Sequence, residues 1–225
     1  MEEKKISNES DTDKSICRIE FSNKKNFGFF IKLFKGDKYL NCLLTNKEII
    51  TKEMIDKKDI LNIQFDHGKI KRQIQLNKEE RYITDFTEIN IDQILIEILE
   101  KDDIGEEYFE FPELKYINRF DKYKDEKIEI PNSSSDGKIN YNQAKIEEIK
   151  NNEFTYSTKV EEDFFGCPIF KSDNKKVIGI VEANKNKAIF IHPIFEFLNK
   201  KNDDQYVSVE LKETGDYYQG KIVND

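Results

Sequence analysis

The amino-acid sequence predicts an all-β protein, and two observations support this prediction. Short runs rich in β-branched and aromatic residues recur along the chain, and charged or polar turns separate them. A spacing of roughly 8–12 residues between such runs favours a sandwich or a barrel over alternating strands and helices. The chain has 225 residues, of which 37% are apolar, and this is enough to fill the core of one large domain.

The candidate strands fall into two groups. The first group comprises residues 15–20, 28–33, 41–44, 60–65, 70–75 and 91–98, and the second comprises residues 127–130, 143–149, 154–157, 168–171, 176–180 and 188–191. Asp66-His67-Gly68, between two apolar runs, is typical of a hairpin turn. Apolar residues at helical spacing in 193–200 predict a short closing helix.

Three segments are expected. Residues 1–15 are polar and predict a flexible N-terminal tail, whereas residues 16–200 contain the strands of the main domain. Residues 201–225 predict a C-terminal β-extension, because 206–211 alternate like a strand. The residues from Tyr217 and Tyr218 onward resemble the opening of a MORN repeat; an unrelated β-extension is the alternative. A lone hairpin is marginally stable, so it needs the main domain, a partner or another copy to cover it.

Composition excludes several classes of function. The net charge of −8 argues against nucleic-acid binding, which needs a basic surface. The chain has no apolar run long enough for a membrane span, and its N-terminus lacks the apolar region of a signal peptide. The three widely spaced cysteines, Cys17, Cys42 and Cys167, indicate reduced thiols in the cytoplasm. With two histidines and no CxxC motif, neither a zinc site nor another cofactor is expected.

Five segments, taken in order, resemble the trypsin-like serine proteases, especially the intracellular branch without disulfides. They span roughly residues 28–198 and are Gly28-Phe29-Phe30-Ile31-Lys32, Cys42-Leu43-Leu44-Thr45-Asn46, residues 90–98, Gly166-Cys167-Pro168-Ile169-Phe170 and Lys176-Val177-Ile178-Gly179-Ile180. The resemblance implies two packed six-stranded antiparallel β-barrels, with a cleft between them, a short C-terminal helix and an appended hairpin.

The residues at the family's catalytic positions do not fit its chemistry, which needs a hydroxyl nucleophile, an imidazole base and a carboxylate that orients the base. The resemblance places Glu48 at the imidazole position and Phe165 at the nucleophile position, and only Asp92 is kept. Asp163, preceded by two glutamates, stands at the oxyanion-hole glycine, where a carboxylate opposes developing negative charge. The resemblance therefore implies an inactive serine protease homologue.

The same positions predict an unusual carboxylate pair. If the fold is kept, Glu48 and Asp92 face each other where a His–Asp pair would be. Two close carboxylates raise the pKa of one of them, so the pair is expected to share a proton or to recruit a lysine.

The remaining candidates each have two interpretations. Phe164 and Phe165 are either exposed anchors for a partner or, as we favour, side chains that fill the former cleft. Cys167 is expected to be a buried structural thiol, and the rival interpretation pairs it with His192 as nucleophile and base. His192 itself is expected to be a surface or satisfied core residue, and His67 a solvent-exposed turn residue.

The sequence thus predicts a catalytically inactive trypsin-like protease homologue that acts as a protein-binding or assembly module in the cytoplasm. Its binding residues would be Phe164 and Phe165 in the former cleft, or Tyr217 and Tyr218 in the tail. One alternative is a structural component of a large assembly, held through its termini. The other is a hydrolase with a rearranged site built on Cys167.

Overall fold

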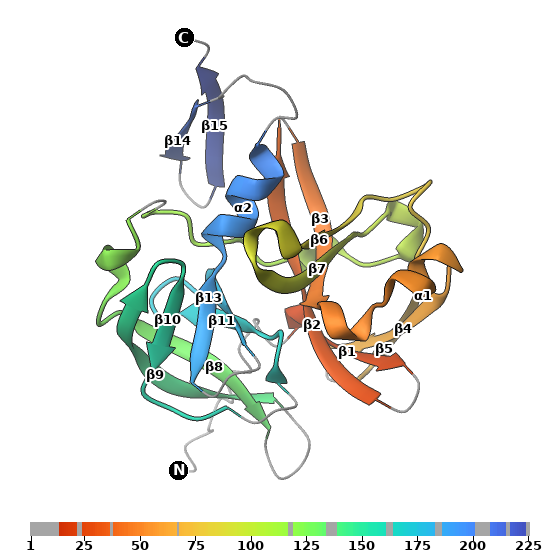
Figure 1. The fold of residues 1–225 in the computed structure, drawn as a ribbon, viewed down its shortest axis with the longest axis horizontal. Helices are drawn as coiled ribbons and strands as arrows, with labels where there is room; N and C mark the ends of the chain where they lie inside the picture. Colours follow the sequence, from red (N-terminus) through yellow and green to blue (C-terminus); the bar gives the residue numbers. More distant parts are fainter. Residues whose placement is uncertain are drawn as a thin grey trace, which may run out of the picture.

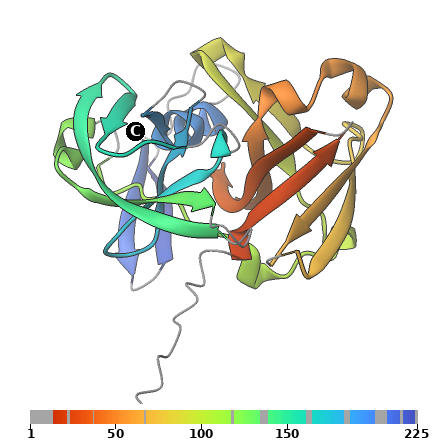
Figure 2. The same cartoon turned by 90° about the horizontal axis from the view of Figure 1, so that it is seen from below.

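Two β-sheets form the body of the protein and lie side by side as two lobes (Figures 1 and 2). This computed structural model describes residues 14–21, 24–36, 38–66, 68–116, 119–133, 139–160, 164–182, 186–200, 208–214 and 217–223. In these ranges we find no helix with the length and apolar character that crossing a membrane requires.

The first lobe is a seven-stranded antiparallel sheet. In sheet order its strands are β5 (Ile70–Gln75), β4 (Ile60–Phe65), β1 (Ile16–Phe21), β2 (Lys24–Lys35), β3 (Lys38–Asn46), β7 (Ile91–Glu97) and β6 (Ile83–Phe86). The pairing of β4 with β5 confirms the predicted hairpin, although His67 in its turn lies outside the described residues. Since β5 and β6 form the two edges, this sheet is open.

The second lobe is a closed six-stranded barrel. In barrel order its strands are β10 (Glu153–Tyr156), β13 (Lys187–Phe190), β12 (Val177–Val181), β11 (Pro168–Lys171), β8 (Lys127–Ser133) and β9 (Ile139–Lys150). β11 and β12 are buried at every residue. β12 is apolar throughout, whereas β11 ends in the buried Lys171, whose ammonium group pairs with Asp173 at 2.7 Å.

Short helices join and close the sheets. Helix α1 (Lys52–Asp56) follows the first lobe's β3, and helix α2 (His192–Asn199) follows β13. Proline near the start of α2 suits the first helical turn, where its missing N–H is not needed. The 3₁₀ turns that accompany them include η2 (Lys47–Ile49), η3 (Thr87–Ile89), η4 (Glu100–Asp102), η5 (Glu106–Tyr108) and η6 (Phe120–Tyr123).

A separate two-stranded sheet follows the main body. It pairs β14 (Ser208–Thr214) with β15 (Tyr217–Val223) in antiparallel register. The predicted C-terminal hairpin is thus present as a pair of strands.

Strand β2 is buried on both of its faces, and this joins the lobes. Phe30 belongs to the core of the first lobe, whereas its neighbours Phe29 and Ile31 belong to a second core that continues into the barrel. Ile194 and Leu198 of α2 also pack into that second core, and Figure 1 shows α2 between the two lobes. Alternation along a strand sends successive side chains to opposite faces, so one strand serves both cores.

The all-β fold with two lobes and a short C-terminal helix is confirmed, with one difference in the first lobe. The family resemblance implied two closed six-stranded barrels, whereas the first lobe has seven strands and two free edges. The extra edge strand is β6, which the strand predictions did not include. Its four residues, Ile83-Thr84-Asp85-Phe86, are too short and too polar to give a clear alternating pattern.

Candidate functional site between the two lobes

The end of strand β3 holds Glu48 at the surface. Thr45 is buried, and its hydroxyl donates a hydrogen bond of 2.9 Å to the carbonyl of Phe27. The side-chain oxygen of Asn46 accepts the backbone N–H of Glu48 at 2.8 Å and so caps the turn η2. This local cap is the ordinary role of asparagine before a helical turn. It leaves the Glu48 side chain exposed to solvent.

Asp92 lies at the neighbouring end of strand β7. The register pairs Asn46 with Gln93, so Asp92 and Glu48 occupy adjacent strand ends, and both side chains are exposed. In the described part of the chain, no hydrogen bond or salt bridge joins these two carboxylates. The shared-proton pair expected from the sequence therefore has no direct contact to support it.

The charge of Asp92 instead contributes to the electrostatic environment of Glu182, a residue that the sequence analysis did not single out. Glu182 follows β12 in the second lobe and is half-buried. Burial raises its pKa first, and the charges of Glu153 and of Asp92 across the lobe boundary raise it further, against an opposing effect of Lys187. The site thus gathers carboxylates from both lobes. The one sequence feature that could have indicated Glu182 is its place directly after the fully apolar strand β12.

The loop before β11 packs into the boundary between the lobes. Phe164 is 2% exposed, and its ring stacks on Phe27 of β2 with 4.8 Å between centroids and 9° between planes. Phe165 is partly buried and packs against the same core. Phe164 is therefore a packing residue that links the two lobes, and no pattern in the sequence indicated Phe27 as its partner.

Gly166 brings this loop directly against the end of β3. Its φ of +85° is in the left-handed region, which favours glycine. A Cβ atom added here would lie 3.2 Å from the backbone nitrogen of Asn46 and 3.4 Å from the carbonyl oxygen of Phe27. The Gly166 N–H also donates to the carbonyl of Val181 at 2.9 Å. The loop that contains Phe165 is therefore held against Asn46, which lies two residues before Glu48 in the sequence.

Cys167 and His192 do not form a reactive pair. Cys167 is fully buried, and burial, followed by the nearby Cys17, raises the pKa of its thiol well above the ordinary value. His192 is buried too, and its Nε2 lies 3.2 Å from the Tyr123 hydroxyl, while burial lowers its pKa to about 3. Among the described contacts none joins the thiol to the imidazole. His192 is therefore a buried core residue, which is one of the two alternatives expected from the sequence. Its Nδ1 has no hydrogen-bond partner among the described residues.

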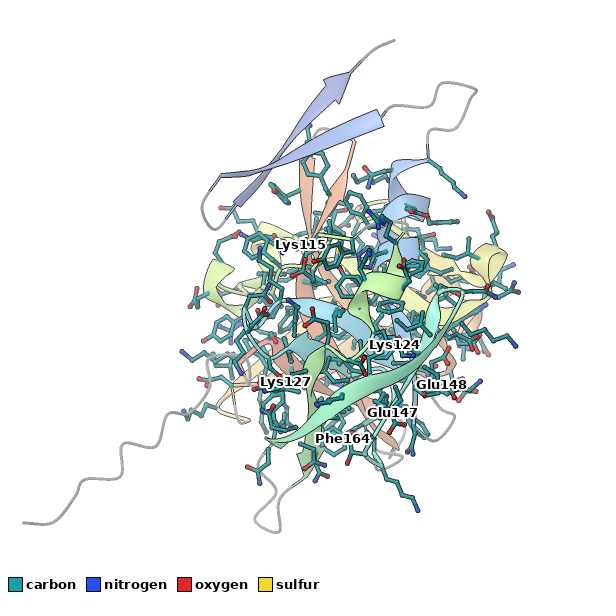
Figure 3. All side chains as sticks on the ribbon, turned by 90° about the vertical axis from the view of Figure 1, so that its left-hand side faces the viewer. Lys115, Lys124, Lys127, Glu147, Glu148 and Phe164 are labelled. Atoms are coloured by element: carbon teal, nitrogen blue, oxygen red, sulfur yellow. The ribbon has the colours of Figure 1, made fainter. Side chains whose placement is uncertain are left out.

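Some predicted site residues lie outside what the structure describes. These are Asp163 with the two glutamates before it, and the side chains of Tyr217 and Tyr218. Within the described ranges, no group of three His, Cys, Asp or Glu residues is arranged to hold a metal ion. An open depression of about 470 Å³ on the barrel is lined by none of the predicted site residues; its walls include Lys124 and Lys127 (Figure 3).

No family model matches this sequence, and no curated protein matches it. Solved structures do. Deg5 is 15% identical with a TM-score of 0.57, and the match covers 83% of this chain and 88% of Deg5. The MamO protease domain from Magnetospirillum magneticum, in its apo form, is 9% identical with a TM-score of 0.53, over 84% and 98% of the two chains. A serine endoprotease from Yersinia pestis is 12% identical with a TM-score of 0.54, over 93% and 71%. The chain therefore shares the two-lobed fold of trypsin-like protease domains.

Proposed function

We propose that this protein is a catalytically inactive homologue of trypsin-like proteases that acts by binding another protein. The observation that carries the proposal is the packing of the Phe164–Gly166 loop against the end of β3. By resemblance this loop contains the nucleophile position. Here it supplies an aromatic ring at Phe165 and no hydroxyl group, so it has no nucleophile to activate.

The charges around the loop support the same proposal. Acyl transfer needs hydrogen-bond donors or positive charge where the oxyanion develops. Glu182 instead brings a carboxyl group next to this loop, because it directly follows Val181, whose carbonyl accepts the Gly166 N–H. Burial and the charges of Glu153 and Asp92 raise the pKa of Glu182. Glu48, exposed at the adjacent strand end, adds a further carboxylate and no imidazole.

The rival hydrolase built on Cys167 has little physical support. A nucleophilic cysteine needs a thiolate in a partly exposed, electropositive environment. Cys167 is buried with a raised pKa, and the candidate base His192 is held neutral by burial and engaged by Tyr123. The raised pKa of Cys167 and the lowered pKa of His192 both favour the neutral thiol and the neutral imidazole over a thiolate and an imidazolium.

The binding partner would meet the protein at the former cleft or at the C-terminal hairpin. At the cleft, the carboxylates of Glu48 and Asp92 are exposed, so a partner there would be expected to supply positive charge. The three cysteines are buried and free of disulfides, which supports a reducing compartment such as the cytoplasm.

The catalytic half of the proposal is tested with purified protein. We expect no labelling by a fluorophosphonate probe and no turnover of unfolded protein substrates. A thiol-reactive probe should not label Cys167 in the native state, and should label it after denaturation. Turnover that persists through purification and disappears in Cys167→Ala would overturn the proposal in favour of the cysteine hydrolase.

The binding half is tested by affinity capture from native lysate. We compare the intact protein with Phe165→Ala, with a truncation after Lys200, and with Phe197→Ala as a control. Phe197 is also partly buried against the same core, so it reports general loosening of that core. Loss of a partner with Phe165→Ala alone assigns binding to the cleft, and loss with the truncation alone assigns it to the tail. If the intact protein captures no stable partner, the binding proposal is wrong.

A further inference from the structure

The chain leaves the main body at the turn between β2 and β3. Asn199, the last residue of α2, donates from Nδ2 to the carbonyl of Phe34 at 2.7 Å, and its Oδ1 accepts the N–H of Gly36 at 3.0 Å. These two bonds fix the end of the helix to this turn. The residues after Lys200 therefore start beside it.

This turn presents an aromatic surface, which we name the turn patch and define as Phe34, Tyr39 and Phe111. The Tyr39 ring meets Phe34 and Phe111 edge to face, with centroids 5.1 and 6.4 Å apart. Tyr39 is 45% exposed although it is large and mostly apolar; Ile60, in β4, is the other such residue in the described ranges. Exposed aromatic clusters of this kind often mark contact surfaces.

The C-terminal hairpin has one apolar face by its register. Val209 pairs with Ile222, Leu211 with Gly220, and Glu213 with Tyr218. Alternation places these six positions on one face, and Tyr217, opposite Thr214, on the other. Since a two-stranded hairpin is marginal by itself in water, its apolar face needs a surface to cover it.

Reach and charge both favour the turn patch as that surface. The segment from Lys200 to Ser208 can span at most about 28 Å when fully extended, so the first residue of the hairpin must lie within that distance of the turn. Residues 201–225 contain six Asp and Glu and three Lys, whereas Lys35 and Lys38 lie on the strands at this turn and Lys32, further along β2, is already paired with Glu106. Because the acidic segment is tethered beside these two lysines, its effective concentration near them is high.

We propose that the hairpin of residues 208–223 docks its apolar face, with Val209, Leu211, Tyr218 and Ile222, on the turn patch of the same chain. In this arrangement Tyr218 faces the patch and Tyr217 faces solvent. The hairpin of β14 and β15 then covers the turn between β2 and β3. This docking is independent of whether the protein is catalytically inactive.

The test uses tryptophan fluorescence, because the chain contains no tryptophan. Tyr218→Trp and Tyr217→Trp are made in the full chain, each as the sole reporter. We expect blue-shifted emission and severalfold weaker acrylamide quenching for Tyr218→Trp than for Tyr217→Trp. Adding Tyr39→Ala should remove this difference, whereas adding Ile60→Ala, which removes an exposed apolar side chain elsewhere, should leave it.

Each other outcome overturns the proposal. Equal quenching of the two reporters means that the hairpin is not docked by this face, and protection that survives Tyr39→Ala means that another surface covers it. Protection that rises with protein concentration, together with a doubled mass by light scattering, assigns the occupied patch to a second copy. Hydrogen exchange gives an independent measurement: Tyr39→Ala should speed exchange at the amides of β14 and β15.

Discussion

Gly166 and Asn46 meet backbone to backbone across the lobe boundary. A Cβ atom at position 166 would lie 3.2 Å from the Asn46 nitrogen, and Gly166 has a φ of +85°. The contact joins a loop of the barrel to the end of a first-lobe strand. Phe164, two residues before Gly166 in the same loop, is buried at this boundary.

Gly166→Ala should therefore destabilise the protein by more than conformational strain alone. A left-handed alanine costs about 1–2 kcal/mol, and the tight approach to Asn46 adds to this. Gly36→Ala is the matched control, because Gly36 has a φ of +62° and no atom of the described residues lies within 4 Å of an added Cβ. Urea denaturation of both variants measures the difference. Equal losses would show that the approach to Asn46 relaxes without cost.

The carboxylates at the lobe boundary give a second prediction. Because burial, Glu153 and Asp92 raise the pKa of Glu182, its charged form is disfavoured in the folded state. The contribution of Glu182 to the free energy of unfolding therefore falls as the pH rises from the ordinary pKa of a glutamate through the raised pKa. Glu182→Gln should thus be at least as stable as the parent at pH 7, and this advantage should shrink as the pH is lowered towards the ordinary range of a glutamate.

Two variants control this measurement. Asp92→Asn removes one neighbouring charge and should act in the same direction by a smaller amount. Glu148→Gln, on the exposed side of β9, should change the free energy of unfolding little at any pH. A clear loss of stability in Glu182→Gln at pH 7 would contradict this account of the site.

The sequence predicted the architecture better than the site, and the reason is physical. Strands β4, β5 and β11 begin and end where predicted, because polar turns bound them: Asp66-His67-Gly68 separates β4 from β5, and Ser172-Asp173-Asn174 follows β11. The inward packing of Phe164 also follows from its chemistry. In contrast, the contacts Phe27–Phe164 and Gly166–Asn46, and the effect of the Asp92 charge on Glu182, each relate segments that are far apart in the chain, and no local pattern encodes such pairs.

A third prediction concerns His192 and acid. Burial lowers its pKa from 6.5 to about 3 in the folded state. The unfolded chain therefore binds a proton that the folded chain does not, and stability from this group is lost as pH falls below 6.5. With about 1.4 kcal/mol for each pKa unit, the loss between pH 7 and pH 5 should be about 2 kcal/mol.

The measurement compares the pH dependence of unfolding in His67→Gln, where His192 is the sole histidine, with that of His67→Gln/His192→Gln. Glutamine keeps an acceptor for the Tyr123 hydroxyl, so the substitution changes the titration more than the packing. The double variant should lose about 2 kcal/mol less than the single one over this pH range. Parallel pH profiles would show that His192 is not held neutral.

The fourth prediction contrasts two neighbouring ion pairs of the first lobe. Arg81 and Asp102 are almost fully buried and form a two-point pair, at 2.7 and 3.0 Å. Asp102 also accepts the N–H of Leu99 at 2.7 Å. Arg72 and Asp103, the next residue along the chain, pair at 2.6 Å, but the Asp103 side chain is 83% exposed.

Asp102→Asn should cost about 3 kcal/mol, because it leaves the Arg81 guanidinium buried without a counter-charge. Asp103→Asn should cost at most about 1 kcal/mol, since water already screens that pair. Asparagine keeps the left-handed preference that position 103 needs, with its φ of 54°, so charge is the main difference in both variants. Denaturation at neutral pH gives both values. Similar costs at the two positions would mean that burial does not set the strength of these pairs, and that water reaches Arg81 when its partner is removed.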